Sequence, residues 1–590
     1  MKQFFKTMLA STVGVFIAMG IIIFIMISVF AGMLVSSSSS TAYTPKPNTV
    51  LKLDLRGVLA EQVQENPFSS ILGEDVEKLS VADIVKAIRK AKDCPEIVGI
   101  YMNASSLSGG FASMETIRRE LESFKESDKF IVAYSDAYTQ GTYYLSSVAD
   151  SIFLNPQGSV ALTGLSSQGV FFTGLAEKLG VKYEIFKVGT FKSAVEPYML
   201  KEFSDANREQ LTSFLNDIWY HILENVSKSR SVDIETLNKY LNEGLAMGEA
   251  ENALQYKLAD ALSYRHDAEN SVKRLAGLDV DGKLKSASVK NMLNIVEMPE
   301  TNEDKVAILY AEGSIMPESA QSTMSGEALI TEKMVDEIYK LKGDKSVKAV
   351  VFRVNSPGGS AYISEQIWKA VVDLKAEKPI VVSMGDYAAS GGYYISCAAN
   401  KIVAEPTTLT GSIGVFGTFP VLAGTMDKIG VTTDVVKTNN FADMGNMLRP
   451  MRDDERVLIQ RSIERTYDLF LTRCADGRGK SKEAIDEIGQ GRVWTGDQAL
   501  ERGLVDRLGG VDIAIEEAAA LAGITKYNIF TANKPKDLIT ELMESMKSDA
   551  EMSFSRYFMS SEELNTMNAI REAKAVKGIQ ARMPFTYQGL

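Results

Sequence analysis

The feature that most constrains this fold is a repeat: the chain contains two copies of one sequence pattern. Residues 138–150 (YTQGTYYLSSVAD) resemble residues 388–400 (AASGGYYISCAAN), at a shift of 250 positions. Further matches lie on both sides at nearly the same shift: Ser108-Gly109-Gly110 with Pro357-Gly358-Gly359, and Leu162-Thr163-Gly164 with Leu409-Thr410-Gly411. So long a period is not that of a solenoid, and it predicts two homologous domains, residues 46–300 and 301–590.

Each half of the repeat alternates short β-branched runs with helical patterns. In the second half, residues 349–354 form a buried-strand run, residues 363–374 keep helical spacing, and residues 379–383 are strand-like again. A further helix is expected from Ser390 onward. Strands that alternate with helices indicate an α/β fold with largely parallel strand pairing.

An apolar segment precedes the repeat. No charged residue occurs from Met8 to Val35, a run longer than the ~20 residues that span a bilayer. A cleaved signal peptide usually has an apolar core of only ~7–15 residues, so the length favours an uncleaved transmembrane anchor. Lys2 and Lys6 lie before it, which predicts a cytoplasmic N-terminus and an exported body. Residues 1–45 are therefore predicted to be a membrane anchor and tether.

Charge and composition narrow the functional classes. The net charge of −12 argues against a nucleic-acid partner, which would favour a basic face. Three widely spaced cysteines exclude a disulfide framework and a four-cysteine zinc site. Neither histidine, His221 in a helical pattern or His266 in a polar stretch, has a neighbouring ligand, so a multi-histidine metal site and a Ser-His-Asp triad are not expected. We expect no metal and no cofactor, and nucleophilic chemistry needs another base.

Two glycine turns in the second half stand where predicted strands meet predicted helices. Ser356-Pro-Gly-Gly359 leaves bare backbone amides, and Ser390-Gly-Gly392 places a hydroxyl at the start of a helix. A helix N-terminus favours developing negative charge. The amides of Gly358 and Gly391 are candidate oxyanion donors, each such donor often contributing ~3–4 kcal/mol. The alternative is that both turns need glycine only for tight packing and that Ser390 is an N-cap.

The repeat favours the catalytic alternative. The position of Ser390 holds Gln140 in the first half, so only the second half can supply the nucleophile. In the aligned region further along, Lys192 of the first half faces Ala442 of the second. An ordinary surface lysine is the default for any single lysine. Here, however, each half keeps one member of a Ser/Lys pair and lacks the other, which predicts one composite site between the domains.

Lys192 can act as a general base only when it is neutral, so its pKa must fall from ~10.4 toward neutrality. Burial in an interdomain cleft would lower the pKa, whereas a nearby carboxylate would raise it. Glu196 lies four residues away and is expected to turn elsewhere, toward Lys201 or a backbone amide. Ser412 is the candidate to accept a hydrogen bond from the amine and orient it.

These motifs resemble those of the long, two-domain form of signal peptide peptidase A (protease IV). The resemblance is carried by four segments: Ser356-Pro-Gly-Gly359, Ala389-Ser-Gly-Gly392, residues 409–415 (LTGSIGV) and residues 191–197 (FKSAVEP). It covers nearly all of the chain after the anchor, although Ser-Pro-Gly-Gly alone is shared with Clp proteases and crotonases. One mild departure is Phe191, where tyrosine is common in the family.

The resemblance implies two tandem Clp/crotonase-like domains after the membrane anchor, with a Ser-Lys dyad divided between them. The nucleophile would be Ser390, the base Lys192 and the lysine-orienting hydroxyl Ser412. It also implies a homotetramer at the bacterial cytoplasmic (inner) membrane, single-pass, with the catalytic body on the extracytoplasmic or periplasmic side. Its substrates would be cleaved signal peptides and other hydrophobic peptides.

Two other functions remain to be weighed. Residues 494–506 also resemble the crotonase superfamily, so an acyl-CoA enzyme is an alternative. Such an enzyme would use carboxylates beside a CoA pocket and would not need export, and the predicted anchor counts against it. A non-catalytic scaffold of degenerate repeats would not preferentially keep Ser390 in one half and Lys192 in the other. The sequence therefore predicts a membrane-anchored serine endopeptidase.

Overall fold

The computed structural model describes residues 42–63, 78–296, 302–318, 328–533 and 579–582, together with isolated positions among the first 21 residues. Apart from such single positions, the predicted anchor from Met8 to Val35 lies outside the described residues. Among the residues that are described, no helix is long and apolar enough to cross a membrane. The anchor and the domain boundary at residues 300 and 301 therefore stay predictions.

The first half is built on a sheet with strand order β2-β1-β3-β4-β5-β7, in which β8 also pairs with β1. Every pair of neighbouring strands in it is parallel. Leu51, Leu53 and Leu55 are buried and alternate with more exposed residues along β1, the period of a strand with one face in the core. The strands are β1 (Thr49–Ala60), β2 (Lys78–Ser80), β3 (Ile97–Ser108), β4 (Phe130–Ser135), β5 (Ser151–Leu154), β7 (Ala261–Leu262) and β8 (Ser286–Ala287).

The second half has its own sheet, with strand order β18-β16-β14-β12-β9-β20; β15 also pairs with β14, and β19 pairs with β15. All of its pairs are parallel except β16 with β18. The strand expected at residues 379–383 is observed as β14. It extends beyond the predicted end, to the residue before Ser390. The strands are β9 (Lys305–Glu312), β12 (Val347–Ser356), β14 (Ile380–Ala389), β15 (Lys401–Ala404), β16 (Leu409–Gly411), β18 (Val493–Thr495), β19 (Arg507–Leu508) and β20 (Asn528–Thr531).

The repeated sequence forms repeated structure. In the first half, β3 leads to helix α4 (Phe111–Lys125), then β4 and helix α5 (Gln140–Ser146). In the second half, β12 leads to helix α13 (Ala361–Lys375), then β14 and helix α14 (Gly391–Ser396). The chain is thus a mixed α/β protein in which one strand-helix unit occurs twice.

A third sheet joins the halves, with strand order β11-β10-β13-β21-β17-β6. Strand β6 of the first half pairs antiparallel with β17 of the second, from Val415 opposite Val188 to Val421 opposite Lys182. These strands are β6 (Lys182–Val188), β10 (Ser314–Ile315), β11 (Leu329–Ile330), β13 (Gly358–Ser360), β17 (Val415–Val421) and β21 (Ile579–Arg582). The two halves therefore share backbone hydrogen bonds as well as side-chain packing.

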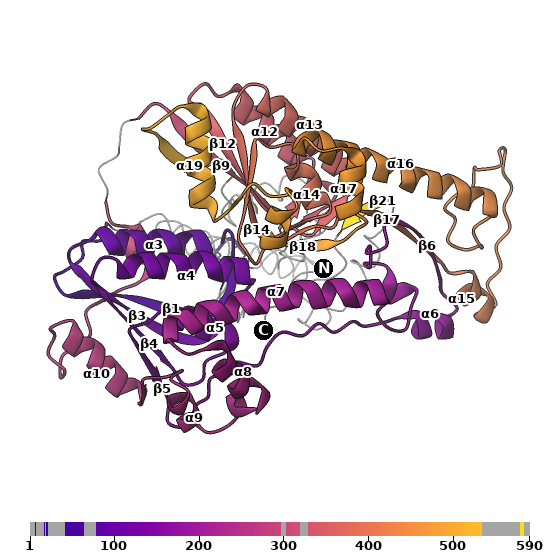
Figure 1. Ribbon diagram of the computed structural model, residues 1–590. Helices are drawn as coiled ribbons and strands as arrows, with labels where there is room; N and C mark the ends of the chain where they lie inside the picture. The colour runs from indigo at the N-terminus through magenta and orange to yellow at the C-terminus, as the bar shows by residue number, and fades with distance from the viewer. Residues whose placement is uncertain are drawn as a thin grey trace.

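A long helix from the first half also crosses to the second. Helix α7 (Asp205–Arg230) begins at Ser204, whose hydroxyl caps the amide of Asn207. It runs along the boundary between the two lobes in Figure 1 and packs against β18. Its apolar side shares a core with Leu409 and Val493 of the second half. The halves are consequently packed as one body at the place where β14 ends.

Candidate active site

Ser390 stands at the junction of β14 and α14 with a strained backbone. Its φ is 56° and its ψ is −113°, outside the regions that residues with a side chain usually adopt. Its amide donates to the carbonyl of Gly411 at 2.8 Å, which fixes the turn against β16. Ser390 occupies the N-cap position of α14, but its hydroxyl makes no capping hydrogen bond there, so the side chain does not act as a helix cap. Backbone strain of this kind is concentrated at functional sites. Here the strained residue keeps its hydroxyl out of the capping bonds of α14.

The structure brings Lys192 to this hydroxyl from the other half of the chain. The Lys192 Nζ lies 2.7 Å from Ser390 Oγ, although the two residues are 198 positions apart. It also donates to both oxygens of Ser412, 3.0 Å to the hydroxyl and 3.1 Å to the carbonyl. All three side chains are fully buried. The three residues that the sequence suggested for this role therefore form one hydrogen-bonded cluster.

Burial controls the ionisation of this lysine. The pKa of the Lys192 amine is held well below its usual value, and desolvation by burial is the cause. Glu196 is turned away, as expected: its carboxylate accepts hydrogen bonds from the Ser204 amide at 3.3 Å and from the Asn207 side chain at 2.9 Å. Lys201 is not its partner, because that amine lies 3.9 Å from Glu177 instead. The site thus has the electrostatics that a neutral lysine base requires.

The two glycine turns lie against each other beside Ser390. A Cβ at Gly392 would meet the carbonyl oxygen of Ser356 at 2.7 Å, so the first turn of α14 touches the turn that follows β12. Gly358 has a φ of 100° and its amide donates to the Ser356 hydroxyl at 3.1 Å. This contact places Gly358 and Gly391, the candidate oxyanion donors, in neighbouring turns. Their catalytic role stays a prediction.

Comparison with known proteins identifies the family. The sequence matches peptidase family S49 in two segments, residues 123–279 and 372–525. Protease 4 of Salmonella typhi is 35% identical over 543 residues, which are 89% of this chain and 86% of that protein. Protease 4 of Haemophilus influenzae is 36% identical over 502 residues, 82% of this chain and 80% of the relative. The chain belongs to peptidase family S49.

A plant relative agrees with this assignment. The chloroplastic serine protease SPPA of Arabidopsis thaliana is 31% identical over 545 residues, 91% of this chain and 78% of that protein. A mutant ClpP1 chain of Listeria monocytogenes gives a TM-score of only 0.24 at 15% identity, covering 35% of this chain and 94% of that one, and so carries no argument about the fold. The S49 chain is a serine peptidase and not an acyl-CoA enzyme. Its two matched segments confirm the tandem form that the repeat predicted.

The S49 site includes residues that the sequence did not reveal. A Cβ at Gly491 would lie 2.7 Å from the Cβ of Lys192, and one at Gly414 would lie 3.1 Å from its Cδ, so two glycines make room for the lysine stem. The Phe191 amide donates to the Gln490 carbonyl at 2.8 Å, which ties the lysine loop to the second half. Gly414 lies in the LTGSIGV motif, but no local signal connects Gly491 to Lys192.

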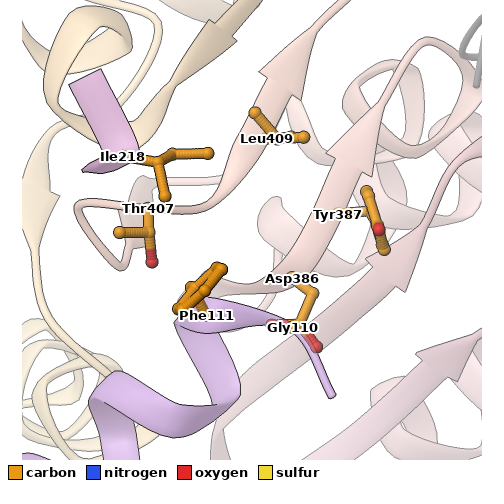
Figure 2. Close-up of a pocket in the computed structure, with 7 residues that line it drawn as sticks. All are labelled: Gly110, Phe111, Ile218, Asp386, Tyr387, Thr407 and Leu409. Carbon is orange, nitrogen blue, oxygen red and sulfur yellow. The ribbon is translucent and has the colours of Figure 1, made fainter. Parts of the chain in front are cut away.

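The strand that carries Ser390 is also held by the first half of the S49 chain. Figure 2 shows Asp386 of β14 next to Gly110 and Phe111 at the start of α4. The Asp386 carboxylate accepts hydrogen bonds from the Ser113 amide at 2.9 Å and from the Ser113 hydroxyl at 2.7 Å. A Cβ at Gly110 would come within 2.1 Å of this carboxyl group. The N-cap residue of α4, Gly110, makes no side-chain capping bond, and Asp386 of the other half accepts the Ser113 amide instead.

A second carboxylate, this one fully buried, lies close to this cap. Glu405, fully buried, accepts both guanidinium nitrogens of Arg119 at 2.8 Å and the hydroxyl of Thr116 at 2.7 Å. Burial raises the pKa of Asp386, while the Ser113 hydrogen bonds oppose the rise. Among the described residues, no three histidine, cysteine or acidic side chains are grouped so as to hold a metal ion. Asp386 and Glu405, both of the second half, accept hydrogen bonds from Ser113, Thr116 and Arg119 of the first half and so join the two.

Proposed function

We propose that this S49 peptidase hydrolyses peptide bonds with Ser390 as nucleophile and Lys192 as general base. The observation that carries the proposal is the 2.7 Å separation of Lys192 Nζ from Ser390 Oγ in a fully buried site. A neutral amine has two N–H groups and one lone pair. The two Ser412 oxygens can take the N–H groups, which leaves the lone pair directed at the Ser390 hydroxyl. Ser412 thus orients the base.

The proposed mechanism is acyl transfer. Lys192 takes the proton of Ser390, and the resulting alkoxide attacks the carbonyl carbon of the scissile bond. The amides of Gly358 and Gly391 donate to the oxyanion; for Gly358 this means exchanging the Ser356 hydroxyl for the substrate oxygen. The Lys192 ammonium then protonates the leaving amine, and water deacylates Ser390.

The proposed substrates are cleaved signal peptides and other hydrophobic peptides. Support comes from names of relatives: a protein of Enterococcus faecium that is 35% identical over 213 residues is called a putative signal peptide peptidase SppA. We further propose that each half has a Clp/crotonase-like fold and that the chain assembles as a homotetramer. Residues 1–45 would anchor it in the bacterial cytoplasmic membrane, with the catalytic body on the extracytoplasmic side, because Lys2 and Lys6 precede the apolar run.

The first test of the catalytic proposal is substitution. Ser390→Ala and Lys192→Ala each remove one reacting group, and we expect each to lower kcat/KM for a hydrophobic peptide on the order of 10⁴-fold. A fluorophosphonate should label the wild type at Ser390 and leave Ser390→Ala unlabelled. Ser193→Ala is the matched control, because Ser193 adjoins the lysine but its hydroxyl donates to the Phe191 carbonyl at 2.8 Å. Substantial turnover by Ser390→Ala would refute the assignment.

A further inference from the structure

Helix α7 presents one buried amide to the surroundings of the proposed catalytic cluster. Gln210 belongs to the first half and is fully buried, yet its side chain contacts both halves. Its Nε2 donates to the backbone carbonyl of Phe191 at 3.0 Å, and its Oε1 accepts from the amide of Val493 at 3.2 Å. No step of the proposed mechanism uses this side chain, so its place between the halves needs a separate explanation.

The Nε2 end of Gln210 holds the loop that carries the proposed base. The Phe191 carbonyl belongs to the planar peptide group that continues into Lys192, so a bond to it fixes the point where the lysine side chain begins. The same Nε2 lies 2.9 Å from the hydroxyl of Ser193, the residue after the lysine. Because a lysine side chain is long and flexible, its amine is placed reproducibly only if its backbone is fixed.

The Oε1 end of Gln210 holds the strand that supports Ser412. Val493 lies in β18, opposite Gly411 of β16. The residue before it, Arg492, accepts the Ser412 amide with its carbonyl at 2.7 Å, and the Gly411 carbonyl accepts the amide of the proposed nucleophile at 2.8 Å. One side chain therefore contacts both the loop that leads to the amine and the strand beside the two hydroxyls.

A carboxylate at the far end of this network keeps the amides in one orientation. Glu196, which the proposed mechanism leaves unused, accepts a hydrogen bond from Asn207 Nδ2 at 2.9 Å. Because a carboxylate can only accept, Asn207 turns its Oδ1 to the other side, where it accepts from Gln210 Nε2 at 3.0 Å. The same orientation directs Gln210 Nε2 at the Phe191 carbonyl and its oxygen at the Val493 amide. Each donor thus meets an acceptor, and a fully satisfied buried network is rigid.

We propose that Gln210 is a positioning residue for the peptidase reaction, which sets the Lys192 amine at hydrogen-bond distance from Ser390 by holding the lysine loop against β18. The inference rests on the proposed roles of Ser390 and Lys192. Gln210 acts through other groups, because its hydrogen bonds go to backbone atoms, Ser193 and Asn207. Its loss would leave the reactive pair present but misaligned, and a displacement of about 1 Å can lower a rate on the order of 10²-fold.

Two substitutions in the full-length protein test this role. Gln210→Met keeps the length of the side chain and removes its donor and its acceptor, and we expect kcat for a hydrophobic peptide to fall on the order of 10²-fold with KM unchanged. Gln210→Asn keeps a buried amide but is one methylene shorter, so it cannot hold both partners at once, and we expect about a tenfold fall in kcat. The rate of fluorophosphonate labelling at Ser390 should fall by the same factors, because labelling uses the same nucleophile and base.

Ser213→Ala is the matched control. Ser213 lies one turn further along α7 and accepts a hydrogen bond at 3.3 Å from Gln498 of α18 (Gly496–Glu501), so this variant also loses a bond between the halves, but one that does not lead to the lysine loop. We expect its kcat and labelling rate to match those of the wild type.

The outcomes separate positioning from a purely structural role. If Gln210 only joins the halves, its variants should lower Tm, as Ser213→Ala does, and leave the kcat of the folded enzyme unchanged. Wild-type kcat and labelling rate in either folded variant, Gln210→Met or Gln210→Asn, would therefore overturn the inference. A wild-type protein that is not labelled at Ser390 would instead refute the proposed catalytic pair, so the two failures are distinct.

Discussion

Two serines of the site hold backbone conformations that cost free energy. Ser390 and Ser412 have φ values of 56° and 50°, and strain of this kind typically costs of order 1–3 kcal/mol per residue. Backbone hydrogen bonds hold both turns: the amide of Ser412 donates to the Arg492 carbonyl at 2.7 Å, as that of Ser390 does to Gly411 at 2.8 Å. These backbone conformations place both hydroxyls next to the Lys192 amine. The burial of Lys192 also lowers the free energy of unfolding, because the buried amine must stay neutral.

The ionisation of Lys192 leads to a prediction about pH. Its pKa in the folded protein lies well below ~10.4, so between these two values the unfolded chain binds one proton more than the native state. The free energy of unfolding should therefore rise with pH across this window, by about 1.4 kcal/mol per unit from this group. Below the folded pKa the contribution stops changing, and kcat/KM should fall because the base is protonated.

Two measurements read this same titration. Urea unfolding of the wild type and of Lys192→Met at a series of pH values isolates the contribution of the amine, because the other titrating groups are common to both proteins. The pH profile of kcat/KM for a hydrophobic peptide gives the apparent pKa in the active enzyme. A stability difference that does not vary with pH, or activity that still climbs through pH ~10, would contradict a buried neutral lysine.

At the level of elements, the two halves have lost complementary strands. Strand β17 covers residues 415–421, whereas the corresponding residues of the first half, 165–171, form no strand. Strand β6 covers residues 182–188, whereas the corresponding residues 432–438 form no strand. The two remaining strands pair with each other. Each half thus supplies one strand as well as one residue of the proposed catalytic pair. The pairing explains why Lys192, just after β6, meets Ser412, just before β17.

The cap of α4 by Asp386 gives a prediction at the same scale. Ser113→Ala removes a hydrogen bond to a half-buried carboxylate, and we expect the free energy of unfolding to fall by about 1–3 kcal/mol at neutral pH. The folded-state pKa of Asp386 is already raised, and the loss would raise it further. Since the cost falls on the ionised form in the folded protein, it should shrink as pH drops through the raised folded-state pKa and Asp386 becomes protonated there. Thermal unfolding at pH 4 and pH 7 measures this difference.

Ser123→Ala is the matched control for this effect. Ser123 lies in the same helix, but its hydroxyl accepts a hydrogen bond from Lys92 of the first half at 2.8 Å and does not face the second half. We expect a small loss of stability that is the same at both pH values. If Ser113→Ala behaves in the same way, the Asp386 cap does not stabilise the contact between the halves.

At the scale of the whole molecule, the two proposed catalytic residues meet within one chain. Lys192 and Ser390 of the same chain lie in hydrogen-bond contact. Strand β6, which precedes Lys192, pairs with β17 of the half that contains Ser390. A homotetramer built from such chains would have independent sites. Mixing therefore distinguishes this arrangement from one in which neighbouring subunits exchange partners.

We predict that mixing the Ser390→Ala and Lys192→Ala proteins does not restore peptidase activity. After joint denaturation and refolding, every site in the mixture should lack one reactive group, and peptide hydrolysis should stay at background. Dyads formed between subunits would instead restore about a quarter of wild-type activity, because random assembly unites the two intact groups in that share of sites. Recovery near that level would move the active site to a subunit interface.

The proposed orientation in the membrane is tested in spheroplasts. Lys2 and Lys6 should keep the N-terminus in the cytoplasm, so residues 46–590 should lie outside it. Protease added to spheroplasts should then degrade the body while a cytosolic control protein stays intact. Protection equal to that of the control would refute the orientation.

The sequence alone determined the repeat and the α/β alternation, and it singled out the candidate reactive pair. Strand and helix periods are local, so residues 349–354 and 363–374 could be assigned without knowing their neighbours. Ser390 and Lys192 were found because each half lacks what the other keeps, a comparison that needs only alignment of the chain with itself. The direction of Glu196, away from the lysine, followed from the chemistry that Lys192 needs.

Only the tertiary structure decided how these parts meet. The burial that lowers the pKa of Lys192, its two bonds to Ser412 and the space left for its stem by Gly491 all join segments hundreds of residues apart. The pairing of β6 with β17, and of β21 with both β13 and β17, is equally non-local. A strand's side-chain pattern specifies which face is buried, but its edge groups are the same backbone N–H and C=O in every strand. Partner choice therefore depends on the packed chain as a whole.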